Sequence, residues 1–146
     1  MIVRIFSDEL IPIISEMIRN GRVVDLTVSG ASMLPFYIDK ETIVTLDNPC
    51  GKFKKYDVVL YRDKGKYKLH RIIGFKKGIL VIRGDALRQK EYVNPDAVIG
   101  RVVNHHTRGK KIMGRSKLYL AKVYFWNLLC PIRPYLLRLF GRCSNK

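Results

Sequence analysis

The spacing of apolar residues changes along the chain, and the first part has the period of a helix. In residues 8–20, apolar side chains recur at intervals of three and four, which predicts a helix with one apolar face. These side chains are Leu10, Ile14, Met17 and Ile18. Ser7 is the expected N-cap, and Gly21 is the expected stop signal. We therefore predict an N-terminal amphipathic helix in residues 1–22, packed on its own domain or docked on a membrane or partner.

From Val23 to Val103 the apolar period becomes two, and β-branched residues are dense. Short polar turns at 63–66 and 76–78 separate apolar runs in the way that antiparallel hairpins require. The predicted strands are Val24–Val28, Thr42–Leu46, Val58–Arg62, Lys68–Phe75, Ile79–Arg83 and Val98–Val103. The expected fold is mainly β: one antiparallel domain over residues 23–103, with short helices on either side.

Residues 104–117 are rich in basic residues and glycine, and they predict a linker. His105 and His106 lie within it. Two histidines that are adjacent in sequence point apart, and no third ligand lies near them in the sequence. We therefore expect them in a solvated loop and predict no metal site.

Residues 118–146 form a basic, apolar tail whose apolar part ends at Phe140. Its longest uncharged run, Val123–Ile132, is shorter than the roughly 20 residues that a membrane-spanning helix needs. Prolines at 131 and 134 predict a break, so two amphipathic helical pieces hinged at Cys130–Pro134 fit best. The predicted role is an interfacial anchor, with Trp126 and three tyrosines at headgroup level and basic residues facing anionic lipid. Packing on the protein's own body or a partner, and a true span, are the alternatives.

The charge of the chain is concentrated in this tail. Its 28 basic and 12 acidic residues give a formal net charge of +16. Residues 101–146 hold 11 basic residues and no acidic residue, whereas residues 1–100 hold 17 basic and 12 acidic residues. An acid-free apolar tail indicates an anionic membrane as partner. The sequence has no helix-turn-helix, RNP signature or zinc finger, which argues against nucleic acid as the partner.

The N-terminus and the cysteines bear on location. The first residues lack the basic head, apolar centre and small-residue cleavage site of a secretory signal. Three cysteines, an odd number without C-x-x-C spacing, are typical of reduced thiols. We therefore expect a cytoplasmic protein that associates peripherally with a membrane. Removal of residues 118–146 is expected to abolish that association and leave the rest of the protein intact.

One turn carries the candidate chemistry. Ser32 follows a strand in Val28-Ser-Gly-Ala-Ser-Met-Leu-Pro35, a tight turn that presents a hydroxyl. Such a serine acts as a nucleophile only when a base reaches it and N–H groups hold the oxyanion. His70 is the only histidine within the β-rich stretch, on an otherwise alternating strand. Ser32 and His70 are therefore the candidate pair.

The order of five motifs adds to this pair. The motifs are Ser29–Pro35 (Ser-Gly-Ala-Ser-Met-Leu-Pro), Lys55–Tyr61 (Lys-Tyr-Asp-Val-Val-Leu-Tyr), His70–Gly74 (His-Arg-Ile-Ile-Gly), Arg83–Ala86 (Arg-Gly-Asp-Ala) and Val98–Val102 (Val-Ile-Gly-Arg-Val). In this order they resemble the type I signal peptidase family, in the serine-peptidase clan that includes the LexA-like self-cleaving repressors. The resemblance covers about residues 23–103. It implies an antiparallel β-fold and an endopeptidase that cuts exposed peptide segments after small residues.

The resemblance assigns roles by position. Ser32 matches the nucleophile, and His70 stands where bacterial members have lysine and the endoplasmic-reticulum and archaeal subtype has histidine. Asp85 matches an acid of the histidine subtype, which would fix the imidazole tautomer or serve the structure; Glu91 is a spare for the acid role. Asp57 matches a framework residue, although Tyr56 precedes it where the family has glycine.

The implied reaction needs no cofactor or metal. Its oxyanion donors would be the N–H of Ser32, with Met33 and Ser29 as neighbours; Ser29 lies three residues before the nucleophile instead of two. The expected activity is cleavage of a leader or signal-like peptide or preprotein through a Ser/His acyl-enzyme, falling below pH of about 6.5. The alternatives are a non-hydrolytic peptide- or leader-binding module of the same fold and, with less support, a nucleic-acid binder.

Overall fold

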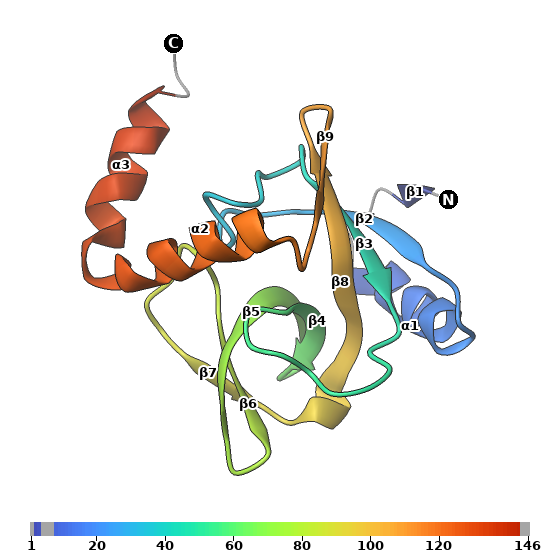
Figure 1. Cartoon of the computed structure of the whole chain (residues 1–146). Coiled ribbons are helices and arrows are strands. Elements are labelled where there is room, and N and C mark those ends of the chain that lie inside the picture. Colours follow the sequence, from blue (N-terminus) through green and yellow to red (C-terminus); the bar gives the residue numbers. More distant parts are fainter. Residues whose placement is uncertain (1, 4–7, 144–146) are drawn as a thin grey trace.

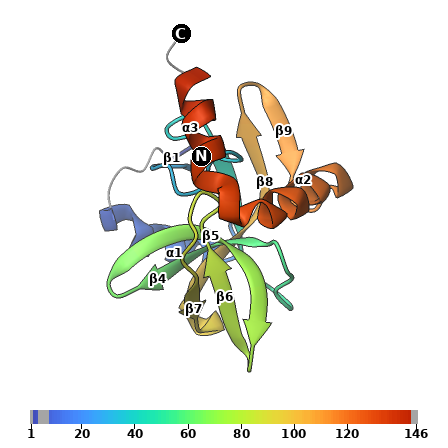
Figure 2. The same ribbon diagram turned by 90° about the vertical axis from the view of Figure 1, so that its left-hand side faces the viewer.

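The computed structural model describes residues 2–3 and 8–143, and its centre is one strongly curved sheet (Figures 1 and 2). Its strands are β1 (Ile2–Val3), β2 (Val24–Thr27), β3 (Ile43–Asp47), β4 (Val58–Asp63), β5 (Lys66–Lys76), β6 (Ile79–Arg83), β7 (Glu91–Val93), β8 (Val98–Thr107) and β9 (Lys110–Met113). The strand order is β1-β2-β3-β8-β4-β5-β6-β7, with β9 paired to β8. All pairs are antiparallel except β1 with β2. The predicted mainly-β antiparallel fold is confirmed.

The helix predicted in residues 8–20 is present as a short 3-10 turn, η1 (Asp8–Leu10), followed by α1 (Ile11–Arg19). Ile11, Ile14 and Ile18 are buried on one face, so α1 covers the sheet of its own domain. The helix ends where Gly21 adopts a φ of +76°, a left-handed conformation that glycine takes without a Cβ clash. Ser7, the expected N-cap, lies outside the described residues.

Strand β4 separates two apolar cores because both of its faces are covered. Val58 and Leu60 join the core under α1, whereas Val59 and Tyr61 join the core formed with β6 and β7. A strand that is buried on both faces has a continuous apolar run instead of an alternating one. Its partner β5 is paired so that Val59 lies opposite His70.

The region 104–117, predicted as a linker, is instead a β-hairpin. β8 continues to Thr107 because it pairs with β3 on one side and β9 on the other. The turn residues Arg108 and Gly109 both have positive φ, the geometry of a two-residue hairpin turn. His105, expected in solvent, is 2% exposed and lies between the rings of Tyr37 and Tyr119. Burial lowers the pKa of His105 to about 4.

The C-terminal tail breaks at the predicted hinge. Helix α2 (Lys117–Leu128) is followed by a 3-10 turn, η3 (Cys130–Ile132), and by α3 (Arg133–Cys143), and the two helices form an L-shaped arm (Figure 1). Tyr119, Val123 and Trp126 of α2 are buried, so this helix is part of the protein's body. Its apolar residues lie on both sides, and it therefore lacks the single apolar face that was predicted.

Arg133 corrects the expectation that the basic residues of the tail face lipid. It is 1% exposed, and its guanidinium donates hydrogen bonds to the backbone oxygens of Leu87 and Trp126. Because Leu87 follows β6, this arginine ties the start of α3 to the loop after that strand. The tail is thereby fastened to the sheet at its hinge.

Candidate active site

Ser32 lies in the turn that follows β2. Two backbone hydrogen bonds close the base of this loop, from Val28 N–H to Thr42 O (2.8 Å) and from Lys40 N–H to Val28 O (2.9 Å). Gly30 has a φ of +92°, and its N–H donates to Asp39 Oδ1 at 2.8 Å. The turn therefore has a fixed shape, and it leaves Ser32 half-buried.

The structure brings the predicted pair together. His70 is in the middle of β5 and is 6% exposed. Its Nε2 lies 3.2 Å from Ser32 Oγ, which is hydrogen-bond distance for a base and a nucleophile. Ser32 and His70 are 38 residues apart in sequence, and the sheet and the β2–β3 loop bring them together.

Tyr61 fixes the imidazole from its other side. Its hydroxyl oxygen lies 2.9 Å from His70 Nδ1 and donates a short hydrogen bond to Glu91 Oε2. A phenol has one proton, so a hydroxyl that donates to Glu91 accepts the hydrogen bond from His70. Neutral His70 then carries its proton on Nδ1, and the lone pair of Nε2 faces Ser32 Oγ. This is the tautomer that a general base needs.

Glu91 is held in its ionised form. Its Oε1 accepts a hydrogen bond of 2.6 Å from Lys68 Nζ, which also lies 3.0 Å from Asp63 Oδ2. Burial alone would raise the pKa of Glu91, but the hydrogen bonds from Lys68 and Tyr61 outweigh burial and lower it. Burial and the neighbouring Glu91 carboxylate raise the pKa of Tyr61 far above its usual range, so Tyr61 keeps its proton.

The pKa of His70 is lowered from its usual value of 6.5, because burial disfavours the charged imidazolium. Glu91 opposes this shift, since its Oε2 lies 3.7 Å from Nδ1 and its negative charge stabilises the imidazolium. Lys68 acts in the same direction as burial. The imidazole therefore stays neutral, and able to take a proton, to a lower pH than an unperturbed histidine does.

Asp85 is bound by Arg71 instead of by His70. Asp85 is buried, and Arg71 Nε lies 2.9 Å from its Oδ1 while Arg71 Nη2 lies 2.8 Å from its Oδ2. Arg71 and His70 are adjacent on β5, and adjacent strand residues point to opposite faces. The hydrogen bonds of the described residues thus favour the structural alternative for Asp85 and place Tyr61 and Glu91 at the imidazole.

Arg71 also connects the sheet with helix α2. Its Nη2 donates to Tyr119 Oη at 2.7 Å, and its Nη1 donates to the backbone oxygen of Tyr56 at 3.0 Å. The guanidinium also lies 5.4 Å from the centre of the Phe36 ring. Tyr56 has a φ of +75°, so the position where the family has glycine does require a left-handed backbone. Asp57 accepts hydrogen bonds from Lys54 N–H and Arg115, as expected of a framework residue.

The Gly84–Ala86 segment contacts the turn that contains Ser32, which we call the nucleophile turn. Ala86 N–H donates to Ser32 O at 2.9 Å. A Cβ on Gly84 would lie 2.7 Å from the same oxygen, a distance that real Cβ contacts do not show, so only glycine allows this approach. Asp85, between them, is fixed by Arg71 on its side chain and by Trp126 Nε1, which donates to its carbonyl at 2.7 Å. The motif therefore shapes the site without touching the imidazole.

Of the predicted oxyanion residues, Ser32 and Met33 belong to the turn, whereas Ser29 lies apart from the pair of Ser32 and His70. Within the described part of the chain, the N–H groups of Ser32 and Met33 donate no hydrogen bond. The side chain of Met33 is buried in the core and anchors the turn. Ser29 is exposed, and the structure gives it no contact with Ser32 or His70.

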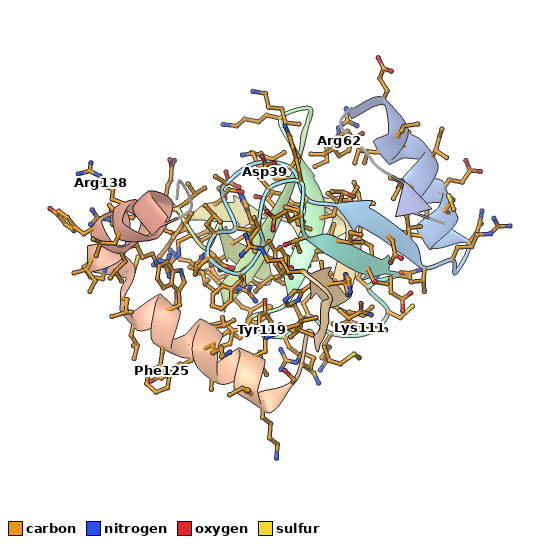
Figure 3. All side chains as sticks on the ribbon, turned by 90° about the horizontal axis from the view of Figure 1, so that it is seen from above. Asp39, Arg62, Lys111, Tyr119, Phe125 and Arg138 are labelled. Carbon is orange, nitrogen blue, oxygen red and sulfur yellow. The ribbon has the colours of Figure 1, made fainter. Side chains whose placement is uncertain are left out.

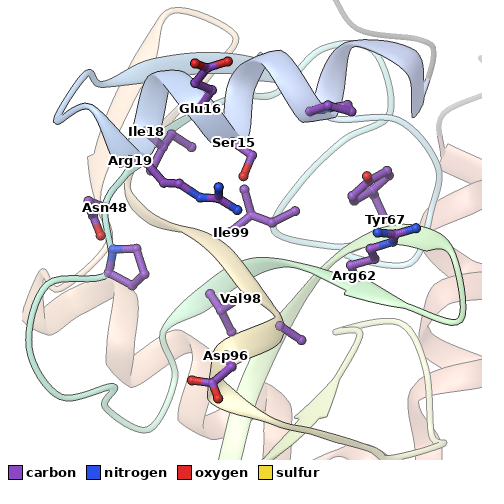
Figure 4. A pocket seen from close by; sticks show the side chains of 13 residues that line it. Ser15, Glu16, Ile18, Arg19, Asn48, Arg62, Tyr67, Asp96, Val98 and Ile99 are labelled. Carbon is purple, nitrogen blue, oxygen red and sulfur yellow. The ribbon is translucent and has the colours of Figure 1, made fainter.

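A separate hollow of about 630 Å³ lies between α1, the β4–β5 hairpin and the start of β8 (Figure 4). Ile18, Arg62 and Tyr67 are among the residues that line it, whereas Ser32 and His70 are not. Tyr67 points to the opposite face of β5 from Lys68 and His70, because side chains alternate along a strand. The hollow therefore belongs to the other side of the sheet from the imidazole.

Tyr61 and Lys68 are the site residues that the sequence reasoning missed. The signal that could have found them is the hairpin turn at Lys64 and Gly65, which fixes the β4–β5 register. In that register Tyr61 lies opposite Lys68, two residues from the pair of Val59 and His70. A comparison of the chain with models of known protein families and with curated proteins found no match.

Proposed function

We propose that the protein is a serine endopeptidase that cleaves a leader or signal-like peptide through an acyl-enzyme on Ser32. The observation that carries this proposal is the hydrogen-bonded chain from Ser32 Oγ through His70 to Tyr61 and Glu91. Isolated Ser–His contacts are common, but here His70 has a defined tautomer and a lowered pKa. In addition, the backbone N–H groups of Ser32 and Met33 donate no hydrogen bond within the described part of the chain. The five-motif resemblance to signal peptidases supports the choice of a peptide bond as substrate.

The geometry supports a two-step reaction. His70 Nε2 takes the proton of Ser32 Oγ as the oxygen attacks the scissile carbonyl, and the N–H groups of Ser32 and Met33 stabilise the oxyanion. The C–N bond then breaks, and His70 gives its proton to the leaving amine. In the second step His70 takes a proton from the water that attacks the ester. The ester C–O bond then breaks, the new carboxyl terminus is released, and His70 returns the proton to Ser32 Oγ. In both steps Glu91, through Tyr61, stabilises the imidazolium while it exists.

Labelling with a fluorophosphonate probe tests the nucleophile and the base. The probe is expected to label wild-type protein on Ser32 and to leave Ser32→Ala and His70→Ala unlabelled. Labelling of His70→Ala at the wild-type rate would exclude His70 as the base. Mass spectrometry of a peptide library then reads the cleavage rule, from products formed by wild type and not by Ser32→Ala. Specific peptide binding without any cleavage would instead favour the non-hydrolytic module.

We place this activity peripherally on a membrane. No helix among residues 8–143 is long and apolar enough to cross one. Residues 101–146 hold basic side chains and no acidic side chain, which supports attachment of the protein to a membrane surface, because cationic side chains are attracted to anionic lipid. Flotation of the full-length protein with vesicles is the direct measurement.

A further inference from the structure

Exposed apolar side chains gather on the C-terminal arm. Among the described residues, eight of the fourteen large hydrophobic side chains that are exposed lie between Leu118 and Leu139. Six of them form what we call the outer face: Leu118, Phe125, Leu128, Leu129, Ile132 and Leu139. Their exposed fractions range from 38% to 71%. Soluble monomers rarely leave apolar groups in such a concentration uncovered.

On α2, the outer-face residues Leu118, Phe125 and Leu128 lie on the side of the helix that does not pack on the sheet. Tyr119, Val123 and Trp126 turn toward the sheet, and Figure 3 shows Phe125 on the opposite side of the helix, pointing away from the body. Trp126 and Tyr119 make hydrogen bonds to Asp85 and Arg71, so α2 cannot roll over to bury its other side without breaking them. A helix that is apolar all round needs a second apolar environment.

The charges around the outer face select among possible occupants. Lys117, Lys122 and Arg138 are exposed on the same two helices, and residues 101–146 contain no acidic side chain. A second copy of the chain would bring two such cationic surfaces together, because a twofold interface pairs a patch with itself. An anionic bilayer offers both the apolar layer and the opposite charge. Tyr124 and Tyr135 are exposed as well, and tyrosine favours the headgroup region.

We infer that the outer face is a docking surface for an anionic lipid bilayer, with the apolar side chains of α2 and η3 inserted between headgroups. This inference deepens the proposed peripheral location and does not depend on peptidase activity. The arm that carries the outer face is fastened to the 83–87 segment beneath Ser32, by Trp126 to Asp85 O and by Arg133 to Leu87 O. Docking therefore holds the nucleophile turn at a fixed distance from the bilayer.

Vesicle flotation with purified full-length protein tests the surface. The protein is expected to float with vesicles of 70% phosphatidylcholine and 30% phosphatidylserine and to stay unbound with pure phosphatidylcholine. Phe125→Gln/Leu128→Gln is expected to lower the partition coefficient at least tenfold, because two inserted apolar side chains are lost. Lys122→Gln/Arg138→Gln is expected to lower it about 25-fold, at about fivefold for each basic residue near an anionic surface.

Ile13→Gln/Phe75→Gln provides the matched control, since both side chains are exposed and apolar but lie on α1 and β5. It is expected to float like wild type. Equal loss in this control, or unchanged flotation of Phe125→Gln/Leu128→Gln, would overturn the inference. A dimer in light scattering that Phe125→Gln/Leu128→Gln converts to a monomer would assign the face to a second copy. Ser32→Ala is expected to float like wild type, so the membrane-docking inference can hold even if the peptidase proposal fails.

Discussion

The hydroxyl of Tyr61 decides which nitrogen of His70 faces the nucleophile. Because it donates to Glu91, it must accept from Nδ1, and Nε2 is left with a lone pair toward Ser32. A carboxylate bound directly to Nδ1 would give the same tautomer. In this protein the Tyr61 hydroxyl lies between the Glu91 carboxylate and Nδ1 of His70, so the charge of the carboxylate stabilises the imidazolium less strongly. Burial can then keep the pKa of His70 low, which suits a base that must be neutral before each turnover.

The pH dependence of acylation follows from this arrangement. In the proposed reaction Ser32 is activated only when His70 is neutral, and the lowered pKa of His70 extends the neutral form to a lower pH than the usual value of 6.5 would allow. The acid limb of the labelling rate is thus expected below pH 6.5, in contrast to the expectation from an unperturbed imidazole. Glu91→Gln removes the negative charge that raises the pKa of His70 and leaves Lys68 paired with Asp63 alone, so the limb is expected to move to still lower pH.

The measurement is the fluorophosphonate labelling rate of wild type and Glu91→Gln between pH 4 and pH 9. The plateau rate of Glu91→Gln is expected to fall about a hundredfold, the scale of general-base effects, because the acceptor of the Tyr61 hydroxyl loses the negative charge that stabilises the imidazolium. Tyr67→Phe is a suitable control on the opposite face of β5. An acid limb that stays in place or moves to higher pH would exclude an electrostatic link from Glu91 to His70.

Asp85 is expected to matter for stability. It receives a bidentate hydrogen bond from buried Arg71, and removal of one partner of a buried ion pair costs about 3–5 kcal/mol, since the other charge stays buried and unpaired. Asp85→Asn should therefore lower the free energy of unfolding in urea by about this amount, whereas exposed Asp96→Asn should change little. If Asp85→Asn kept full stability but lost labelling, a direct catalytic role for Asp85 would be restored.

At the scale of the elements, the contact between the Gly84–Ala86 segment and the nucleophile turn determines the site geometry. Gly84→Ala would place a Cβ 2.7 Å from Ser32 O, so either the turn or the segment must move. We expect Gly84→Ala to lower the labelling rate at least tenfold, because small displacements of a nucleophile cost large factors in rate. Gly74→Ala, where a Cβ meets nothing within 4 Å, should label normally.

The sequence predicted the strands well because their period of two reflects burial on one or two faces. All six predicted strands occur, with ends that differ by a few residues, and Ser32 and His70 meet as expected. It failed at β9 (Lys110–Met113), because two lysines followed by two apolar residues do not alternate as a strand with one buried face does. It also could not reveal that Asp85 faces Arg71, because that depends on how the loop after β6 turns.

At the scale of the whole molecule, the cationic arm packs against the sheet that carries the candidate site. Split by sequence, the charge suggested a domain of net charge +5 and a separable tail of +11. In the structure the first helix of that tail supplies Tyr119 to Arg71 and Trp126 to Asp85, and Arg83 donates to Asn127. One face of α2 thus supports the candidate site, and the opposite face is the surface that we propose for membrane docking.

Removal of residues 118–146 therefore has a different expected result from the one that the sequence suggests. Without Tyr119, Trp126 and Arg133, the polar groups of the Arg71–Asp85 pair and the Leu87 carbonyl lose buried partners, and each loss costs about 1–3 kcal/mol. We expect the truncated chain to lose Ser32 labelling together with vesicle binding and to unfold at least about 10 °C lower than wild type. Phe125→Gln/Leu128→Gln should lose vesicle binding alone. A truncated chain that still labels at the wild-type rate would show that the candidate site does not need the arm. The hydrogen bonds of Trp126 to Asp85 O and of Arg133 to Leu87 O would then have no role in the activity of Ser32.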